Sequence, residues 1–356
     1  MSQPENILIF RLGSLGDTLI ALPCFNLIRR AYPDRKIFLL TNEPISAKAA
    51  AAMTILHDGG LCDQAIAYPA NTRDFKKLFA LRKEIQSHQF EVVIHLFTNR
   101  GWSRSWRDCL FFRACGIKRV IGAPQLFPPR DSRSSKPMLE QQSAGLVRKL
   151  RPIGSIDISD LAVWDLHLRP EEKQSATNLL KTGEISSPFI AASIGTKALA
   201  KDWGDENWKK VFEHISAASP ELGLVLIGSA DEYERSDNMR RIWHGPSANL
   251  CGKSEPRVSA AVLEKAGLFV GHDSGPMHLA AAVGIPLVAV FSWHNPPGEW
   301  YPGCVEWEHI ITFYPPLPDG IWQPGLRLQR SPTEGILLIK PEPVAEACLR
   351  LMRAAP

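Results

Sequence analysis

The sequence is poor in the features that mark secreted, disulfide-bonded or membrane-spanning proteins. Its seven cysteines are scattered and form no Cys-x-x-Cys pair, so most are expected to be small buried residues in a reducing compartment. No run of 18 uncharged apolar residues occurs, so no membrane-spanning helix is expected. The N-terminus, Met1 to Asn6, is short and polar and does not match a signal peptide. These absences favour a cytoplasmic protein.

The sequence also lacks a strong excess of charge of one sign. With 41 Lys and Arg against 37 Asp and Glu, the net charge is +4, without the clustered positive charge of a nucleic-acid-binding protein, and no nucleic-acid partner is expected. A mildly basic chain still favours an acidic substrate or a negatively charged membrane face. The length of 356 residues predicts two domains of ordinary size.

Several common catalytic and metal-binding motifs are absent. We find no Ser-His-Asp nucleophile elbow, no Walker A loop and no cluster of zinc ligands. His272, Asp273 and His278 lie close together, but their spacing differs from His-Glu-x-x-His and no third ligand group is evident nearby, so no metal is expected. We expect His278 to pack under the loop as a helix residue, and Asp273 to order the turn by accepting backbone N–H bonds.

Both halves of the chain alternate apolar, strand-like runs with helical patterns. This alternation predicts doubly wound α/β sheets. The expected strands are Ile7–Phe10, Lys36–Leu40, Gln64–Ala67, Val92–Leu96 and Arg119–Ile121 in the first half, and Phe189–Ser193, Leu224–Ile227, Leu268–Val270 and Leu287–Phe291 in the second.

The domain organisation follows from the same pattern. The linker candidate, residues 151–172, separates an N-terminal domain of residues 1–170 from a C-terminal domain of residues 171–341. Residues 342–356 are expected to form a closing helix, with packing back on the N-terminal domain as one option. The segment 295–330 is rich in Pro, Gly, Trp and Tyr, which predicts sparse regular structure and favours a long ordered loop beside a site.

The most informative segment follows the expected strand Leu268–Val270. It reads Gly-His-Asp-Ser-Gly-Pro-Met-His from Gly271 to His278 and then becomes apolar and rich in alanine, which is the order of a strand, a tight turn and a helix N-terminus. Free backbone N–H groups at a helix start bind anions, Gly275 lets a ligand come close, and Ser274 adds a hydroxyl donor. The first hypothesis is therefore a site for the diphosphate of a nucleotide or nucleotide-sugar.

Asp17 follows a turn that contains Gly13 and Gly16, directly after the first expected strand. One interpretation is an ordinary acidic residue in the first turn of a helix, where the helix dipole favours it. The other is a catalytic base at the carboxyl edge of a parallel sheet, where the active sites of α/β proteins lie. The turn does not match Gly-x-Gly-x-x-Gly, so the dinucleotide-binding fingerprint is weak.

Two further charged residues follow strands of the second half. Lys201, in Lys-Asp-Trp, is either a solvated lysine or a cation that neutralises charge on a leaving phosphate, and nearby Lys197 could substitute for it. Glu232, after the turn at Gly228, is either an acidic residue at a helix start or a bidentate acceptor for two ribose hydroxyls.

Arginines and aromatic residues are interleaved in the first half of the chain. The conservative interpretation is an amphipathic helix with a solvated basic face. Because arginine forks match carboxylates and phosphates, the group, with Asn99, is also a candidate site for an anionic acceptor. The residues concerned are Arg100, Arg104, Arg107 and Arg113, among Trp102, Trp106, Phe111 and Phe112.

Together these segments resemble glycosyltransferase family 9, the bacterial heptosyltransferases that build the lipopolysaccharide inner core. The most specific element is Asp-Ser-Gly-Pro-Met-His-Leu-Ala from Asp273 to Ala280, and the opening from Ile7 to Asp17, running on to Leu22-Pro23, is second. The similarity covers most of the chain. Further matching elements are Phe90–His95, Gly122, Lys201–Trp203, Gly228–Glu232 and Ile339–Val344.

The resemblance implies an α/β protein with a GT-B fold, in which two Rossmann-like doubly wound domains face each other across a cleft. It implies inverting, metal-independent transfer of a sugar, heptose by default, from an ADP-sugar that is a co-substrate and not a cofactor. The acceptor, a lipopolysaccharide core or other anionic or lipid-linked saccharide, would bind the N-terminal domain, and the nucleotide-sugar donor the C-terminal one. Peripheral contact with the inner face of the cytoplasmic membrane is compatible with such an acceptor.

The resemblance also implies residue roles. Asp17 would be the general base that deprotonates the acceptor hydroxyl, and Lys201 would hold the donor phosphates. Ser274 and Gly275 would bind the diphosphate, and Glu232 the ribose, with Glu234 as the neighbouring alternative. The expected donor-binding set is Gly13, Gly16, Lys201, Gly228, Glu232, Asp273, Ser274, Gly275, Met277 and His278, and the expected acceptor-binding set is Asn99, Arg100, Arg104 and Arg107.

Two residues depart from the family pattern, and two other functions stay open. Ser274 stands where the family often has threonine, and Ser292 stands where it commonly has glycine after a strand. A nucleotide-binding oxidoreductase would need an acidic residue about 20 residues after an intact glycine fingerprint; Glu43 is present, but the glycine pattern is broken. The other alternative is a catalytically silent module that binds nucleotide-sugars.

Overall fold

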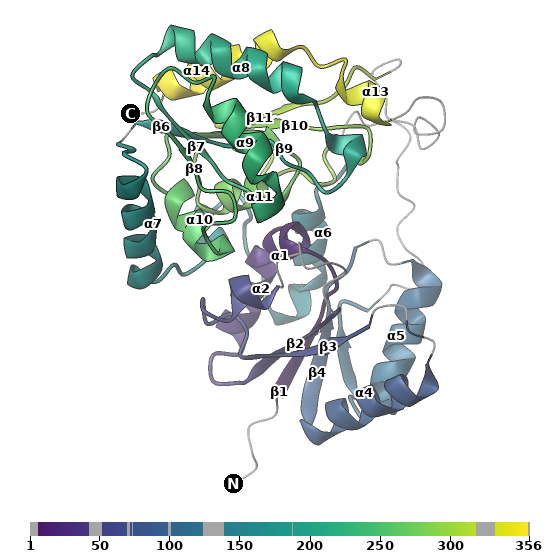
Figure 1. Cartoon of the computed structure of the whole chain (residues 1–356). Coiled ribbons are helices and arrows are strands. Elements are labelled where there is room, and N and C mark those ends of the chain that lie inside the picture. The colour runs from purple at the N-terminus through teal and green to yellow at the C-terminus, as the bar shows by residue number, and fades with distance from the viewer. Residues whose placement is uncertain are drawn as a thin grey trace. The chain divides into compact units, whose positions relative to one another are not determined.

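The computed structural model describes residues 6–42, 52–69, 72, 74–98, 101–123, 139–186, 188–317 and 332–354. The chain forms two compact α/β units, each built around its own parallel sheet (Figure 1). The first unit comprises residues 1–131 and 142–167, and the second comprises residues 132–141 and 168–356. No helix among the described residues is long and apolar enough to cross a membrane.

The first unit contains a five-stranded sheet in the order β3-β2-β1-β4-β5, with all neighbouring strands parallel. Its strands are β1 (Asn6–Phe10), β2 (Ile37–Asn42), β3 (Gln64–Tyr68), β4 (Phe90–His95) and β5 (Arg119–Ile121). Its helices are α1 (Leu15–Leu19), α2 (Leu22–Ala31), α3 (Met53–Leu56), α4 (Phe75–Ser87), α5 (Trp102–Ala114) and α6 (Gln142–Lys149), followed by the 3-10 turns η1 (Arg151–Ile153) and η2 (Leu161–Trp164).

Helices α4 and α5 cover the same face of this sheet. Leu81 and Ile85 of α4 join Phe112 of α5 in one apolar cluster with Leu8 and Phe10, which alternate along β1 and therefore point to one side. This arrangement leaves the opposite sides of both helices facing away from the core.

The second unit contains a six-stranded sheet in the order β11-β10-β9-β6-β7-β8, again with all neighbours parallel. Its strands are β6 (Phe189–Ser193), β7 (Gly223–Leu226), β8 (Ser247–Asn249), β9 (Leu268–His272), β10 (Leu287–Val290) and β11 (Ile310–Phe313). Its helices are α7 (Pro170–Thr182), α8 (Asp205–Ala218), α9 (Tyr233–Arg240), α10 (Pro256–Leu263), α11 (Gly275–Ala282), α13 (Pro332–Ile336) and α14 (Pro341–Ala354), with the 3-10 turns η3 (Leu199–Lys201) and η4 (Ala230–Glu232).

The predicted α/β class and the nine predicted strands are confirmed, and three details differ. The helical pattern after Gly16 forms two helices, α1 and α2, because the chain turns at Ile20 and Ala21 and Pro23 then sits at the start of α2. The segment 295–330, predicted to have sparse regular structure, contains the four-residue strand β11, which the sequence did not predict; its residues 318–330 lie outside the described residues. Helix α14 packs on α8 in the second unit, whereas the sequence analysis allowed packing on the N-terminal domain.

Each sheet has one point at which the chain changes direction across it. In the first sheet this point lies between β1 and β4, and in the second between β6 and β9. Loops that leave the carboxyl ends of such a strand pair diverge, and ligands of open α/β sheets bind in the crevice that results. The segments that follow these four strands are therefore where a site is expected.

Candidate functional site

Asp17 lies in the first turn of α1, just after β1. The Ser14 backbone N–H donates to the Asp17 Oδ2 atom at 2.7 Å, and the Ser14 hydroxyl donates to the same oxygen at 3.0 Å. The Asp17 side chain is half-buried, so it is not enclosed in the core. The structure thus holds a carboxylate at the carboxyl edge of the first sheet, with one oxygen engaged by its own turn.

Arg11, which the sequence analysis did not single out, holds this turn in place. Its Nε donates to the Asp17 carbonyl oxygen at 2.8 Å, a bond that its Nη2 also makes, and its Nη1 donates to the Leu96 carbonyl oxygen at 2.8 Å. The guanidinium is buried, and burial lowers the pKa of Arg11. Arg11 therefore ties the turn after β1 to the segment after β4, across the switch point of the first sheet.

Lys201 and Asp273 form an ion pair at the switch point of the second sheet. The Lys201 Nζ lies 2.6 Å from the Asp273 Oδ2, and the Asn295 side-chain amide donates to the same oxygen at 3.1 Å. The exposed fraction is 17% for the Lys201 side chain and 7% for that of Asp273, so the pair is largely desolvated. The sequence predicts backbone N–H donors for Asp273, but among the described residues the donors to its carboxylate are the side chains of Lys201 and Asn295. Lys197, the alternative lysine, is exposed.

Ser274 is the N-cap residue of α11, immediately after Asp273. Its hydroxyl oxygen is buried and has no hydrogen-bond partner among the described residues. Gly275 opens the helix, and Met277 and His278 are buried, so His278 is a buried helix residue, as the sequence predicts. A buried hydroxyl without a partner is costly unless a ligand or water completes it, and here it lies at a helix N-terminus that favours anions.

Glu232 lies at the end of the turn that follows β7. The Ser229 backbone N–H donates to the Glu232 Oε2 at 3.0 Å, and burial raises the pKa of the Glu232 carboxyl. The carboxylate lies against two glycines: a Cβ on Gly195 would fall 2.0 Å from the Glu232 Cδ, and a Cβ on Gly228 would fall 2.1 Å from Oε2. Glu234 is exposed, so Glu232 is the carboxylate beside the ends of β6 and β7.

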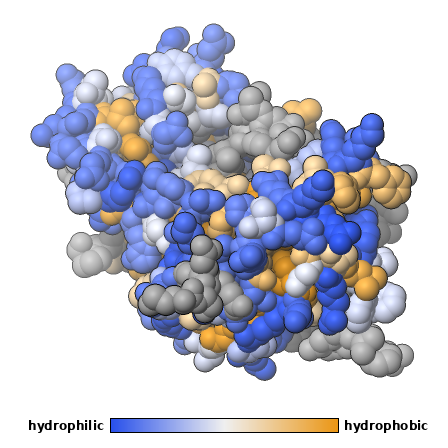
Figure 2. Space-filling model, turned by 90° about the horizontal axis from the view of Figure 1, so that it is seen from below, coloured by the Kyte–Doolittle hydropathy of each residue, from blue (hydrophilic) through white to orange (hydrophobic). Residues whose placement is uncertain are grey.

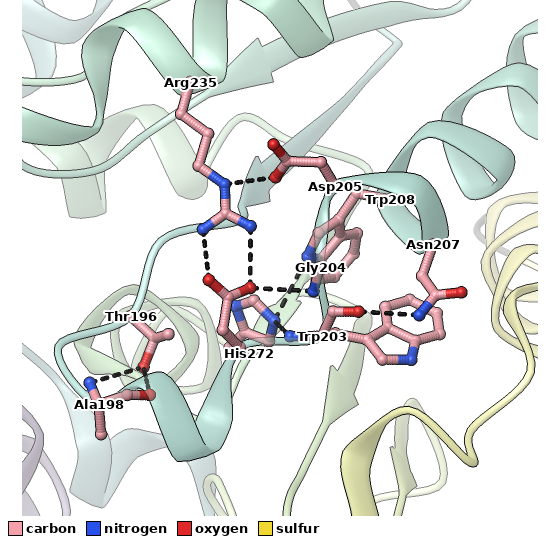
Figure 3. A network of polar contacts seen from close by, with 10 residues as sticks. Thr196, Ala198, Trp203, Gly204, Asp205, Asn207, Trp208, Arg235 and His272 are labelled. Atoms are coloured by element: carbon pink, nitrogen blue, oxygen red, sulfur yellow. Dashed lines mark hydrogen bonds and ion pairs between the residues drawn. The ribbon is translucent and has the colours of Figure 1, made fainter. Parts of the chain in front are cut away.

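A buried network fixes the segment that carries Lys201 (Figure 3). The His272 Nε2, at the end of β9, accepts from the Trp203 backbone N–H at 3.0 Å and from the Trp208 Nε1–H at 3.3 Å. Arg235 makes two 2.8 Å hydrogen bonds to the carboxylate of Asp202. The sequence analysis noted Lys-Asp-Trp and weighed His272 only as a metal ligand, because the partners of these residues lie 30 or more positions away in sequence.

The expected acceptor residues are only partly described. Asn99 and Arg100 lie outside the described residues. Arg104 and Arg107 are exposed on α5, where the Arg107 Nη2 lies 3.6 Å from the Asp108 Oδ1. Ser105, Cys109 and Phe112 of this helix are turned inward, whereas its outer side is mixed, because Trp102 and Leu110 are exposed there beside the arginines.

Metal-ligating side chains do not gather in the part of the chain that the structure describes: no three His, Cys, Asp or Glu side chains there could hold an ion together. The positive groups at the end of β9 are the Lys201 ammonium and the partial positive charge of the α11 N-terminus. Gly13 and Gly16 lie in the turn beside Asp17 in the first unit, whereas the other expected donor residues belong to the second unit.

The family comparison covers the core of both units. Residues 78–310 match the family model described as glycosyltransferase family 9 (heptosyltransferase). Lipopolysaccharide heptosyltransferase 3 of Escherichia coli K12 is 24% identical to the chain over 308 residues, which are 84% of this chain and 85% of that protein.

The comparison with solved structures covers nearly the whole chain. A glycosyl transferase family 9 protein from Veillonella parvula aligns with a TM-score of 0.74 at 18% identity, over 99% of both chains. The E. coli ADP-heptose lps heptosyltransferase II aligns with a TM-score of 0.63 at 16% identity, over 98% of this chain and 99% of that one. At these identities the likeness shows the fold, which is GT-B.

The family match does not favour the oxidoreductase alternative. The matched model spans more than half of the chain. The chain therefore belongs to glycosyltransferase family 9 and is a glycosyltransferase.

Proposed function

We propose that this protein transfers a sugar, heptose by default, from an ADP-sugar to a lipopolysaccharide core or another anionic saccharide, with inversion and without a metal ion. The names of its relatives support the donor and acceptor classes, since one is an ADP-heptose lps heptosyltransferase and another a lipopolysaccharide heptosyltransferase.

The observation that carries the proposal is the Lys201–Asp273 pair beside Ser274. These residues bring an ammonium from the segment after β6 to the end of β9, where a buried hydroxyl without a partner among the described residues and the N-terminus of α11 follow directly. Such donors suit the diphosphate of a nucleotide-sugar. In this proposal Glu232, held at the end of β7, accepts hydrogen bonds from the ribose hydroxyls.

In the proposed reaction Asp17 removes the proton from the acceptor hydroxyl. The acceptor oxygen then forms a bond to the anomeric carbon on the face opposite the diphosphate, and the bond between that carbon and the diphosphate oxygen breaks. ADP leaves with the electron pair, and Lys201 and the N–H groups of α11 stabilise its negative charge. A divalent ion is not needed if these groups carry that charge.

We extend the proposal to peripheral contact with the cytoplasmic membrane through α4 and α5. Figure 2, the view from below Figure 1, shows hydrophobic residues scattered among hydrophilic ones. The outer sides of these helices expose large apolar side chains, with exposed fractions of 86% for Phe75, 54% for Phe79, 54% for Trp102 and 63% for Leu110. The helices contain seven basic and two acidic residues, and one of the acidic residues, Asp108, is buried. Exposed aromatic groups among basic side chains suit an anionic lipid surface.

The experiment is a coupled assay of ADP release with ADP-heptose and a lipopolysaccharide core acceptor. Release that requires both substrates supports the proposal, and Asp17→Asn should lower kcat by about 10²-fold or more while the protein folds normally. Glu234→Gln, an exposed carboxylate change in the second unit, is the control and should retain activity. Full turnover by Asp17→Asn would remove the base assignment.

Three further measurements address the remaining parts of the proposal. Activity that persists in excess EDTA supports metal independence, and loss restored by a divalent cation contradicts it. Binding of ADP without transfer to any acceptor tested would favour a catalytically silent module. Flotation with phosphatidylglycerol vesicles, weakened by Phe75→Ser with Phe79→Ser, tests the membrane contact.

A further inference from the structure

We propose that His272 is a positioning residue that sets the place of Lys201 beside Asp273, and so tunes binding of the donor nucleotide. The inference rests on the proposed role of Lys201. It adds a residue that would touch no substrate and would act through the main chain on either side of the ion pair.

His272 is joined to both partners of that ion pair. His272 is the last residue of β9 and directly precedes Asp273, so the position of its backbone determines where the Asp273 side chain begins. Across space its Nε2 accepts the backbone N–H of Trp203, which lies two residues after Lys201. One imidazole therefore connects the loop after β6 to the end of β9, the two strands that flank the switch point of the second sheet.

The geometry around Nε2 requires an unprotonated nitrogen there. The Trp203 N–H and the Trp208 Nε1–H both point at this atom, at 3.0 and 3.3 Å, and a nitrogen that accepts cannot carry a proton (Figure 3). All three residues are essentially inaccessible to water, and the two indole rings meet edge to face at 5.0 Å. Water therefore does not replace the imidazole as acceptor without repacking.

Other contacts hold the rest of the same segment, so His272 acts on a loop with little freedom. The Trp203 Nε1 donates to the Ile339 carbonyl oxygen at 3.1 Å. Asp202 accepts from Arg235 and from the Gly204 backbone N–H at 3.0 Å. Because the loop is fixed at residues 202 and 203, the backbone position of Lys201 is restricted too. The Lys201 Nζ lies 2.6 Å from the Asp273 Oδ2.

The test compares two replacements of His272. His272→Leu keeps an apolar group of similar bulk but leaves two buried N–H donors without an acceptor, whereas His272→Gln keeps an acceptor oxygen. We expect the leucine variant to raise the Kd for ADP and the KM for the nucleotide-sugar by about tenfold, which corresponds to the loss of one buried interaction. The KM for the saccharide acceptor should stay unchanged, and glutamine should restore part of the loss.

His214→Leu is the matched control, because it makes the same change on the exposed side of α8 in the same unit and should leave ADP binding unchanged. In a Lys201→Ala background, His272→Leu should add little further loss, since the group that it positions is gone. If His272→Leu does not fold, Trp208→Phe removes one of the two donors to Nε2 and should weaken ADP binding in the same selective way.

The outcomes separate the inference from the proposed function. A wild-type protein that binds no ADP overturns both. A wild-type protein that binds ADP, with a folded His272→Leu that binds it equally well or weakens both substrates alike, overturns the positioning role alone. Full additivity of His272→Leu and Lys201→Ala also overturns it.

Discussion

The carboxylate of Asp17 lies over Gly13, in the space that a side chain on residue 13 would occupy. A Cβ built on Gly13 falls 2.4 Å from both the Cβ and the Cγ of Asp17, and the backbone φ there is +140°. Glycine is thus required twice at this position, for its backbone conformation and for the close approach of the acid. The same arrangement recurs in the second unit, where Glu232 lies over Gly228 in another Gly-Ser-x-x-acid sequence.

Gly13→Ala is expected to displace Asp17, because the clashing atoms belong to the rigid start of its side chain. If Asp17 is the base, kcat should fall by about 10²-fold. Gly116→Ala is the control, since Gly116 also has a positive φ but a Cβ there would meet no atom within 4 Å. Steady-state kinetics beside a thermal melt separates the two effects; similar kcat values for both variants would contradict the prediction.

Lys201→Met is expected to cost stability as well as donor binding. The substitution leaves the buried Asp273 carboxylate without its cation. Removing one member of a buried ion pair lowers the free energy of unfolding by about 3 kcal/mol. Adding Asp273→Asn should recover most of the unfolding free energy but not ADP affinity. Urea unfolding and ADP titration measure the two quantities, and Lys197→Met, on an exposed lysine, should change neither.

Donor binding is expected to depend on the protonation of Glu232. Burial raises the pKa of this carboxyl, so protons bind it at a higher pH than they bind an ordinary glutamate. If the carboxylate accepts from ribose hydroxyls, ADP affinity should fall as the pH drops through that raised pKa, and Glu232→Gln should remove this dependence. An unchanged pH profile of ADP binding in the variant would contradict the ribose role.

His272 is expected to make the second unit sensitive to mild acid. Burial lowers the pKa of His272 from 6.5 to about 4, against the opposing effects of Asp202, the Gly195 backbone and Asp273, while Arg235 acts in the same direction as burial. Between pH 6.5 and about 4, the unfolded chain therefore binds a proton at His272 and the folded chain does not. Stability from this residue is complete above pH 6.5 and falls by about 3 kcal/mol as the pH drops to 4.

Urea unfolding between pH 7 and pH 4 measures this loss, with His272→Gln as the comparison. The variant should lose less stability across the same range, because glutamine does not titrate. Identical slopes for the two proteins would contradict the assignment. Carboxylates with lowered pKa values, such as Glu172 and Asp237, contribute mainly below this window, since they gain protons at still lower pH.

The seven cysteines are expected to resist thiol reagents in the folded protein. All are buried and none is in a disulfide bond, and burial raises the pKa to about 12 for Cys24 and Cys62 and to about 11 for Cys115 and Cys251. Because the thiolate is the reactive form, Ellman's reagent should label them slowly in buffer and completely in guanidinium. Rapid labelling of any one thiol in buffer would contradict its burial.

The sequence predicted nine strands because buried parallel strands are continuous apolar runs, and it missed two strands for different reasons. Ser247–Asn249 forms an edge strand of polar residues and alanine, which no apolar pattern reveals. Ile310–Phe313 is apolar but lies among the prolines and tryptophans of the segment 295–330, which obscured it. Both segments are strands because they pair with a neighbouring strand of the sheet, and not because of their local sequence pattern.

In the candidate site too, local features could be predicted from the sequence and long-range contacts could not. The turns that carry Asp17, Glu232 and Ser274 could be placed from sequence, because a strand end followed by a helix start is a local signal. Long-range pairs could not: Lys201 meets Asp273 72 positions away, and Trp203 meets His272 69 positions away. Only the folded sheet brings the ends of β6 and β9 together.

The ion pair between Lys201 and Asp273 makes anion binding a competition. A ligand that approaches the ammonium must displace a carboxylate that is already 2.6 Å from it and anchored by Asn295. On the proposed function, a singly charged anion would gain little from such an exchange, whereas a diphosphate would carry enough charge to displace Asp273 from the lysine. After release of ADP, Asp273 would bind Lys201 again, so the same two side chains would discriminate against monovalent ions.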